Sequence, residues 1–442
     1  MSNRIKARVI DWTALDAAQR AAVLNRPAQD NAAELLQTTQ GIINEVRRGG
    51  DAALRAMTEK FDGAVLHNLQ VSEAEFAAAE QALTATQLTA LKRAIGNVQR
   101  FHEAQLSEPL RVETSPGVVC ERHYRAIDAV GLYAPAGTAP LPSTVIMLAV
   151  PASIANCPTR VLCTPPRRDG SADPAVLVTA RLCGIDKVFK IGGAQAVAAM
   201  AYGTESVPKT DKIYGPGNRW VTAAKMLVAN DAQGAALDLP AGPSEVLVLA
   251  DDRANAAFVA ADLLAQAEHS ADAQAILVTT SAALIERVQA ELDRQTSQLS
   301  RENTLLKALE HARLILVKDL HTAFEVSNLY APEHLIVQVD NARQWLPQIR
   351  NAGSVFLGPW TPETMGDYCS GTNHVLPTYG FARAYSGLSL VDFMKRMTVQ
   401  ELSSAGLEDL GPTAVTIAEL EGLDAHANAV KLRMATLKQG AA

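Results

Sequence analysis

The chain has 442 residues, of which 48% are hydrophobic and 20% are charged, and its formal net charge is −7. This composition is typical of a soluble globular protein with enough apolar material for roughly two to four domains. Because no basic run occurs, we expect no nucleic-acid partner. We also expect no signal peptide and no membrane span. The five cysteines form no CxxC pair, so we expect reduced thiols in a cytoplasmic protein.

The first part of the chain, from about residue 15 to 110, is rich in alanine and carries an apolar residue every three or four positions, which predicts helices. Asp51 follows Gly49-Gly50 and is typical of a helix N-cap. From about residue 117 the pattern changes to short apolar segments, which we interpret as strands, at 118–120, 129–133, 149–154 and 160–165.

Strands and helices then alternate in two successive runs. In the first run we predict a helix at 175–183, a strand at 187–191 and a helix at 194–202. The second run has strands at 245–249, 275–279 and 314–317, with helices at 254–268, 281–295 and 320–329. This alternation with short turns indicates an α/β protein with parallel sheets that helices cover on both faces. After about residue 380 the sequence predicts helix again, as at 390–395.

Four residues are candidate metal ligands. Gln266 and His269 are three positions apart in a predicted helix, so both side chains lie on one face. Asp367 and His426 lie downstream. Two histidines, one aspartate and one amide suit zinc or a similar divalent ion. The alternative is a polar helix face in water, because acidic residues at 262, 268 and 272 flank the pair.

A carboxylate and an imidazole are adjacent at Glu333-His334, a pair that would supply a general base and a proton relay. The alternative is an exposed N-cap region after Pro332. Gly and small polar residues dominate residues 366–374, which we predict to form a loop containing Asp367, Asn373 and His374. This segment is either a functional loop or simply a long turn.

Three glycine-containing turns are candidate ligand contacts: the turn at 131–138 follows a predicted strand, the turn at 192–195 lies between a strand and a helix, where α/β sheets bind ligands, and the turn at 215–219 precedes a helix. They contain Tyr133, Gln195 and Asn218, and Tyr133 is placed to stack on a nicotinamide or adenine ring. The G-x-G-x-x-G fingerprint is absent, so ordinary turns and a buried aromatic residue are the alternative. Ser244 lies in another turn and would either contact a substrate or cap the turn.

A catalytic cysteine would indicate an aldehyde dehydrogenase with a covalent thiohemiacetal. Cys157, Cys163 and Cys183 lie in apolar contexts that favour buried packing, and Cys120 fits either role. Cys369 lies beside Asp367 and is the one candidate nucleophile.

Together these segments resemble histidinol dehydrogenases from the N-terminal helices to near the C-terminus. The matching stretches are GLYAPAG (131–137), KIGGAQAVAAMAYGTESVPKTDKIYGPGN (190–218), DLPAGPSEVLVLAD (238–251), DLLAQAEHS (262–270), YAPEHL (330–335), GDYCSGTNHVLPTYG (366–380) and EGLDAHANAV (421–430).

The resemblance implies oxidation of L-histidinol to L-histidine, through L-histidinal and with two NAD, as the last step of histidine biosynthesis. It implies one zinc ion per subunit, held by Gln266, His269, Asp367 and His426. Glu333 and His334 match the catalytic acid-base residues. The matched NAD contacts are Tyr133, Gln195 and Asn218. The matched substrate contacts are Ser244, Gln266, His269, Glu333, His334, Asp367, His374, Glu421 and His426.

The resemblance also implies an intertwined homodimer with two incomplete Rossmann-like parallel-sheet domains and helical N- and C-terminal extensions. We therefore expect Glu421 and His426 to complete the site of the other subunit. The expected segments are an N-terminal extension (1–25), a first domain (26–130 with 238–382), a second domain (131–237) and a helical dimerisation segment (383–442).

Two other interpretations remain open at this point. One is a related zinc-dependent dehydrogenase that acts on another amino alcohol or on a sulfonate diol. The other is a non-catalytic binding protein with two α/β domains, which would need neither zinc nor NAD.

Overall fold

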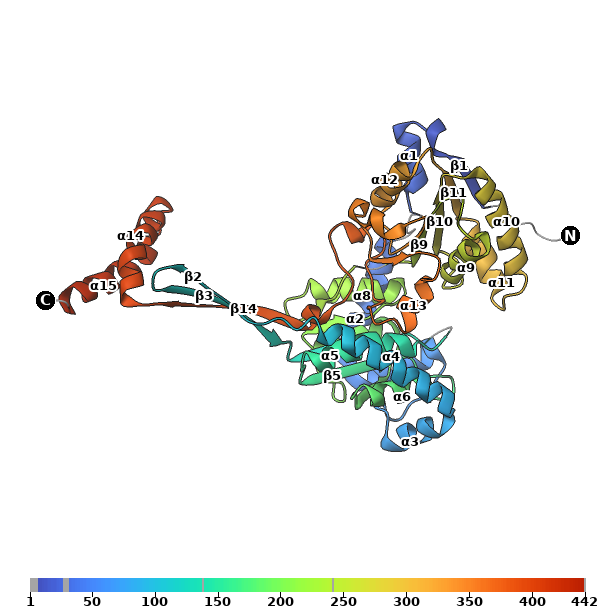
Figure 1. Cartoon of the computed structure of the whole chain (residues 1–442). Coiled ribbons are helices and arrows are strands. Elements are labelled where there is room, and N and C mark those ends of the chain that lie inside the picture. Colours follow the sequence, from blue (N-terminus) through green and yellow to red (C-terminus); the bar gives the residue numbers. More distant parts are fainter. Residues whose placement is uncertain (1–6, 27–31, 137–138, 241, 441–442) are drawn as a thin grey trace. The chain divides into compact units, whose positions relative to one another are not determined.

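The computed structural model describes residues 7–26, 32–136, 139–240 and 242–440. Residues 137, 138 and 241, which belong to two of the predicted turns, lie outside the described residues. The chain divides into two compact units (Figure 1). The first unit contains residues up to 104 together with 127–393, and the second contains residues 105–126 and those from 394 onward.

One sheet of the first unit has six parallel strands in the order β1-β11-β10-β9-β12-β13. The strands are β1 (Arg8–Asp11), β9 (Glu245–Ala250), β10 (Gln274–Thr279), β11 (Arg313–Leu316), β12 (His334–Gln338) and β13 (Ser354–Leu357). All six residues of β9 are buried, and alternate ones join different cores. Val246 and Val248 pack on one face of the sheet, and Leu247 and Leu249 pack on the other.

Helices cover both faces of this sheet (Figure 1). One face carries α9 (Ala256–Ala267), α10 (Ala282–Thr296) and α11 (Glu302–Leu309). The other carries α12 (Leu320–Tyr330) and the N-terminal α1 (Ala17–Leu24). Burial on both faces explains why the strands are continuous apolar runs rather than alternating patterns.

The second sheet of this unit has five parallel strands in the order β6-β5-β4-β7-β8. The strands are β4 (Ala129–Tyr133), β5 (Thr159–Thr164), β6 (Lys187–Lys190), β7 (Lys212–Tyr214) and β8 (Ala236–Leu237). Its helices are α5 (Pro142–Ile154), α6 (Pro174–Leu182), α7 (Gly193–Tyr202) and α8 (Arg219–Ala229). Apart from the added edge strand β1, both sheets follow the doubly wound order without its sixth strand.

Three N-terminal helices pack against the helices of the five-stranded sheet. They are α2 (Ala32–Asp62), which contacts α7 and α8, α3 (Glu73–Ala82), which contacts α6, and α4 (Ala85–Glu103), which contacts α5. The segment boundaries given above stay a prediction. This packing favours grouping residues 32–103 with the five-stranded sheet rather than with residues 238–382.

The second unit combines a small antiparallel sheet with two helices. The sheet order is β14-β3-β2, formed by β2 (Leu110–Ser115), β3 (Val118–Ala126) and β14 (Met394–Leu402). Helices α14 (Ser404–Leu420) and α15 (Asp424–Gly440) pack on each other. The unit exposes many large apolar side chains, at Leu110, Val112, Met397, Val399, Leu402, Ile417, Leu420, Leu423 and Leu432. This exposure exceeds what an isolated small sheet and helix pair would usually present to water.

The structure confirms an α/β protein with two parallel sheets and helical terminal segments. Two predicted elements are wrong. Residues 149–154 form the end of helix α5 rather than a strand, because residues 143–152 are buried on every side and show no helical period. The helix predicted at 390–395 is a short 3-10 turn that runs into strand β14.

A break in α2 falls at the predicted Gly49-Gly50 pair, where Gly50 has a φ of 50°. Asp51 does not cap its own helix there. Its carboxylate accepts hydrogen bonds from the hydroxyls of Thr204 and Ser206 and so ties α2 to the end of α7. In the part of the chain that the structure describes, no helix is both long and apolar enough to cross a membrane.

A buried ion pair joins the N-terminal segment to the start of β9. The Arg26 guanidinium donates to both carboxylate oxygens of Glu245, whose side chain is 0% exposed. It also donates to the carbonyl oxygens of Tyr330 and Ala331, at 3.0 and 3.4 Å. Ala331 has a φ of 55°, in the left-handed region that L-residues disfavour. Arg26 therefore holds the strained turn that leads directly to Glu333 and His334.

Replacing Arg26 with Met should lower the free energy of unfolding by about 3–5 kcal/mol, because Glu245 then stays buried without its cation. Denaturant-induced unfolding measures this loss. Arg47→Met is the matched control, because Arg47 pairs with Asp231 at a site where both side chains are about one-third exposed. It should cost at most about 1 kcal/mol. Equal losses in the two variants would contradict the role given to Arg26.

Candidate active site

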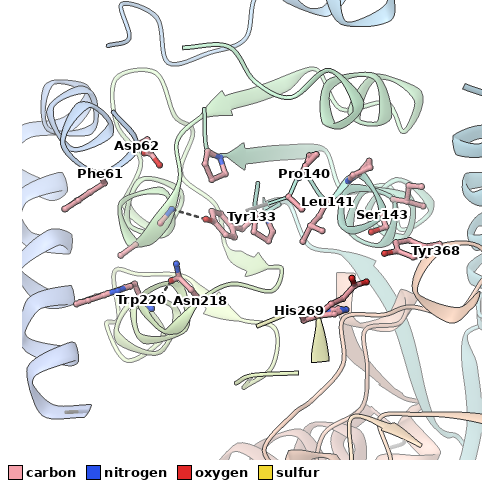
Figure 2. A pocket seen from close by; sticks show the side chains of 18 of the residues that line it. Phe61, Asp62, Tyr133, Pro140, Leu141, Ser143, Asn218, Trp220, His269 and Tyr368 are labelled. Atoms are coloured by element: carbon pink, nitrogen blue, oxygen red, sulfur yellow. Dashed lines mark hydrogen bonds between the residues drawn. The ribbon is translucent and has the colours of Figure 1, made fainter. Parts of the chain in front are cut away.

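A cavity of about 1190 Å³ lies in the first unit, between residues of the two parallel-sheet layers. Tyr133, Gln195 and Asn218, the three predicted NAD contacts, all line it. The predicted metal ligand His269 lines the same cavity. Figure 2 shows Tyr133 and Asn218 between the side chains of Phe61 and Asp62 on one side and that of His269 on the other. The structure thus brings a predicted cofactor site and a predicted metal ligand to one space.

The three cofactor candidates lie at the carboxyl edge of the five-stranded sheet. Tyr133 ends β4, Gln195 lies in the first turn of α7, and Asn218 caps α8. Because β4 and β7 are neighbours and their helices lie on opposite sides, this is the crevice where doubly wound sheets bind ligands. The Tyr133 hydroxyl accepts a hydrogen bond from the backbone N–H of Gly193 at 3.0 Å (Figure 2). Burial raises the pKa of Tyr133 far above its ordinary value, so the phenol stays neutral.

Glu333 and His334 lie at the amino end of β12, and both are buried. One Glu333 oxygen accepts a hydrogen bond from the Glu245 backbone N–H at 2.8 Å. The Nδ1 atom of His334 lies 3.1 Å from Gln266 Oε1 and 3.2 Å from the Glu245 carbonyl oxygen. Both acceptors fix the proton on Nδ1. The alternative of an exposed N-cap region is therefore wrong.

The other ring nitrogen of His334, Nε2, faces Asp367 Oδ1 at 3.4 Å. A further carboxylate, Glu363, approaches Nδ1 to within 4.0 Å from the short helix α13 (Glu363–Tyr368). Glu363 is 1% exposed, and its Oε2 has no hydrogen-bond partner among the described residues. Glu363 is not among the predicted site residues, because a glutamate after a proline has the pattern of an ordinary helix start.

Acidic groups outnumber cationic ones in this cluster, and their pKa values reflect it. Burial raises the pKa of Glu333 to about 8 and that of Glu363 well above its ordinary value. Burial alone would lower the pKa of His334, but the charges of Glu333, Glu363 and Asp367 outweigh it and raise that pKa. Burial would raise the pKa of Asp367, but His334 and the nearby histidines lower it. His334 and Asp367 therefore form an ion pair in a largely buried site.

Gln266 and His269 lie at the end of α9, where the structure differs from the prediction. The helix ends at Ala267, so His269 follows it, and its backbone N–H donates to the Gln266 carbonyl at 3.2 Å. Gln266 is fully buried and His269 is accessible from the cavity, so the pair is not a polar helix face in water. Asp367 lies in the last turn of α13 rather than in the predicted loop.

The residues present fit a divalent cation by their donor chemistry. Gln266, His269 and Asp367 offer an amide oxygen, an imidazole nitrogen and a carboxylate, and the charges of His269 and Asp367 act on each other, so the two side chains lie close together. No three His, Cys, Asp or Glu side chains of the described ranges are arranged to hold a metal ion. The predicted set contributes only two such side chains to the first unit, since Gln266 is an amide and His426 lies elsewhere.

The remaining predicted substrate contacts divide between the two units. Ser244 directly precedes β9, and His374 follows α13 with its Nε2 atom buried and without a partner among the described residues. The charge of Asp367 acts on His374, which places the two side chains near each other. Glu421, the C-cap of α14, and His426, in α15, are exposed on the second unit. The first unit therefore does not itself contain them.

The cysteines bear on the thiol alternative. Cys157, Cys163 and Cys183 are buried, as predicted, and burial raises the pKa of each thiol, to about 11 for Cys157 and about 12 for Cys183. A raised pKa disfavours the nucleophilic thiolate. Cys120 and Cys369 are half-buried, and Cys369 lines the same cavity as His269.

Known proteins match this chain over nearly its whole length. The family model for histidinol dehydrogenase matches residues 24–434. The histidinol dehydrogenase of Xanthomonas oryzae pv. oryzae is 57% identical over 427 residues, which is 97% of this chain and 99% of the relative. That of Aliivibrio fischeri is 54% identical over 432 residues, which is 98% of each chain.

A solved structure agrees with these sequence matches. The crystal structure of histidinol dehydrogenase from Elizabethkingia anophelis superposes with a TM-score of 0.94 and 43% identity, covering 98% of this chain and 99% of that chain. The chain belongs to the histidinol dehydrogenase family of NAD-dependent oxidoreductases, which catalyse the final step of histidine biosynthesis.

Proposed function

We propose that this chain oxidises L-histidinol to L-histidine through L-histidinal, with two NAD, at the buried cluster around Glu333 and His334. One observation carries the proposal. His269, whose electrostatic neighbours are Asp367 and His334, lines the same cavity as Tyr133, Gln195 and Asn218. A hydride acceptor bound in that cavity would therefore adjoin the acid-base pair. His374 and Ser244 would contact the substrate from the same side.

We propose that Gln266, His269, Asp367 and His426 hold one zinc ion per subunit. Three of these residues belong to the cluster in which buried carboxylates outnumber cationic groups, a situation that a divalent ion relieves. When bound, zinc would orient the imidazole and amino groups of the substrate, and it would take no part in electron transfer.

His334 would remove the alcohol proton in the first oxidation while hydride passes to NAD. Its Nδ1 proton is fixed by Gln266 and the Glu245 carbonyl, which leaves Nε2 to act as the base. The charges of Glu333, Glu363 and Asp367 raise the pKa of the ring. A cation held by Asp367 would reduce the share of that shift that Asp367 causes.

Glu333 would activate the water that attacks the bound aldehyde, and the resulting gem-diol would give a second hydride to a second NAD. Burial raises the pKa of Glu333 to about 8, which suits a group that must both accept and release a proton near neutral pH. The Glu245 N–H fixes one of its oxygens, so the other is the one that faces the water.

We infer that the second unit forms an intertwined homodimer and that Glu421 and His426 complete the partner's site. The apolar side chains that this unit exposes need a covering surface, and both residues lie among them on α14 and α15. The shared strand order supports two Rossmann-like domains that each lack a sixth strand. A cytoplasmic location agrees with the half-buried, unpaired thiols of Cys120 and Cys369.

Two other functions remain for comparison. Oxidation of another amino alcohol or of a sulfonate diol would use the same dehydrogenase chemistry. A comparison of these substrates with histidinol, on purified enzyme, distinguishes these activities. A binding protein without catalysis would have no use for buried carboxylates around His334, which cost stability.

Purified protein mixed with L-histidinol and excess NAD should yield two NADH per histidinol consumed. A chelator should abolish the reaction, because without the metal the substrate is no longer oriented at the base. Added zinc should restore the activity. Metal analysis should find one zinc per chain, and a His269→Ala variant should lose it. Zinc-replete protein that produces no NADH from histidinol would contradict the assigned substrate.

Replacing Glu333 with Gln should lower the rate of histidinal oxidation by about 10²–10⁴-fold, because a general base is lost from the water-dependent step. Histidinol oxidation should fall much less. Separate assays that start from histidinol and from histidinal measure the two rates. Equal losses would exclude this division of roles.

In the same assays Cys369→Ala should keep both activities, and loss of aldehyde oxidation with zinc retained would favour a thiol mechanism.

Mixing Glu333→Gln and His426→Ala chains under conditions of subunit exchange tests the shared site. If His426 acts in the partner's site, each mixed dimer contains one intact site, and random exchange restores about a quarter of wild-type activity. If His426 acts within its own chain, every site stays defective. If the mixture is no more active than the separate variants, a site shared between subunits is contradicted.

A further inference from the structure

The cavity has two chemically different ends. At one end His269 and Tyr368 lie next to the Glu333–His334 cluster, and at the other end lie Phe61, Asp62 and Trp220 (Figure 2). This inference rests on the proposed function, which puts the nicotinamide of NAD at the cluster. The reacting atoms must approach to about 3–3.5 Å. The adenosine half of the dinucleotide must then extend toward the end that contains Asp62.

Asp62 has the properties of an unsatisfied binding group. It is the last residue of α2 and lines the cavity. Its Oδ2 atom is buried without a hydrogen-bond partner, and no cationic side chain of the described residues forms an ion pair with it. Burial raises the pKa of Asp62 to about 6, so the group is still ionised at neutral pH. A buried carboxylate without partners costs stability, which a role in ligand binding would explain.

The five-stranded sheet lacks the carboxylate that usually binds ribose in this topology. In dinucleotide-binding domains, an acidic residue at the end of the second strand accepts hydrogen bonds from the adenosine ribose. Here the second strand, β5, ends at Thr164 and is followed by Pro165, which lines the cavity. The next acidic residue, Asp169, is exposed and accepts hydrogen bonds from Ser171 instead.

The residues around Asp62 suit an adenosine group. Phe61 is 51% exposed, and together with Trp220 it offers aromatic surface at this end of the cavity. The charge of Asp62 acts on the Tyr133 hydroxyl, whose oxygen already accepts the Gly193 N–H. Aromatic surface for a purine and a free carboxylate for a diol therefore lie together, at the end farther from the catalytic cluster.

We propose that Asp62 accepts hydrogen bonds from the ribose hydroxyls of the adenosine half of NAD and thereby selects NAD over NADP. The helix α2 supplies a carboxylate that the strand end does not. A 2′-phosphate would remove one of the hydroxyl donors and would bring a second negative charge against the buried carboxylate.

Asp62→Asn tests the proposal in the full-length protein, with Glu59→Gln as the matched control. Glu59 lies one turn earlier on α2, is exposed and does not line the cavity. Fluorescence titration with NADH and with NADPH gives both dissociation constants without turnover, and steady-state assays give kcat/KM for NAD and NADP. Asp62→Asn should weaken NADH binding and should lower the NAD-to-NADP preference by roughly tenfold or more. Glu59→Gln should change neither.

The outcomes separate this proposal from the proposed function. Wild-type protein that oxidises histidinol, with an Asp62→Asn variant that keeps the wild-type NAD-to-NADP ratio, would overturn the role of Asp62 alone. Wild-type protein that binds no NADH would overturn both. Asp62→Asn should leave the KM for histidinol unchanged and should not lower the midpoint of thermal unfolding. If that variant is unstable, Asp62→Ser should show the same loss of preference, and a wild-type ratio in a folded Asp62→Ser would contradict the proposal.

Discussion

The buried cluster around Glu333 and His334 depends on how one residue, Glu245, is held. Its carboxylate pairs with Arg26, and one of the same oxygens accepts the backbone N–H of Tyr379. Its own backbone N–H holds Glu333, and its carbonyl oxygen faces Nδ1 of His334. Three chain segments that are distant from Glu245 in sequence thus meet at this residue. The geometry of the proposed acid-base pair and the stability of this part of the fold therefore share the same contacts.

The two sheets contribute opposite edges to the site. Tyr133 and Asn218 follow strands, at the carboxyl edge of the five-stranded sheet, as the general rule for doubly wound sheets expects. Glu333 and His334 instead lie at the start of β12, and Ser244 precedes β9, at the amino edge of the six-stranded sheet. The cavity between the layers can therefore hold a cofactor against the five-stranded sheet and a substrate against the polar residues of the six-stranded sheet. Neither sheet alone forms a complete site.

Sequence patterns predicted the parts of the site that have a local cause. Tyr133 and Gln195 were found because glycine turns follow apolar strands, and Glu333-His334 was found as an adjacent pair. Glu363 and Asp62 were missed, since each ends or begins an ordinary helix and only tertiary packing buries it. The same limit explains helix α5, whose fully buried residues show no period. The family resemblance implied the roles of individual residues that spacing alone left open.

The charge balance of the cluster explains why stability and function oppose each other here. Glu333 and Glu363 are buried close to His334, and Asp367 lies against its ring, whereas Arg26 is already paired with Glu245. Apolar residues of similar size would make a more stable core. A ligand that binds the folded state and neutralises these carboxylates offsets the cost through its own binding free energy. The site is therefore organised for a charged occupant, and the fold bears the cost of keeping it ready.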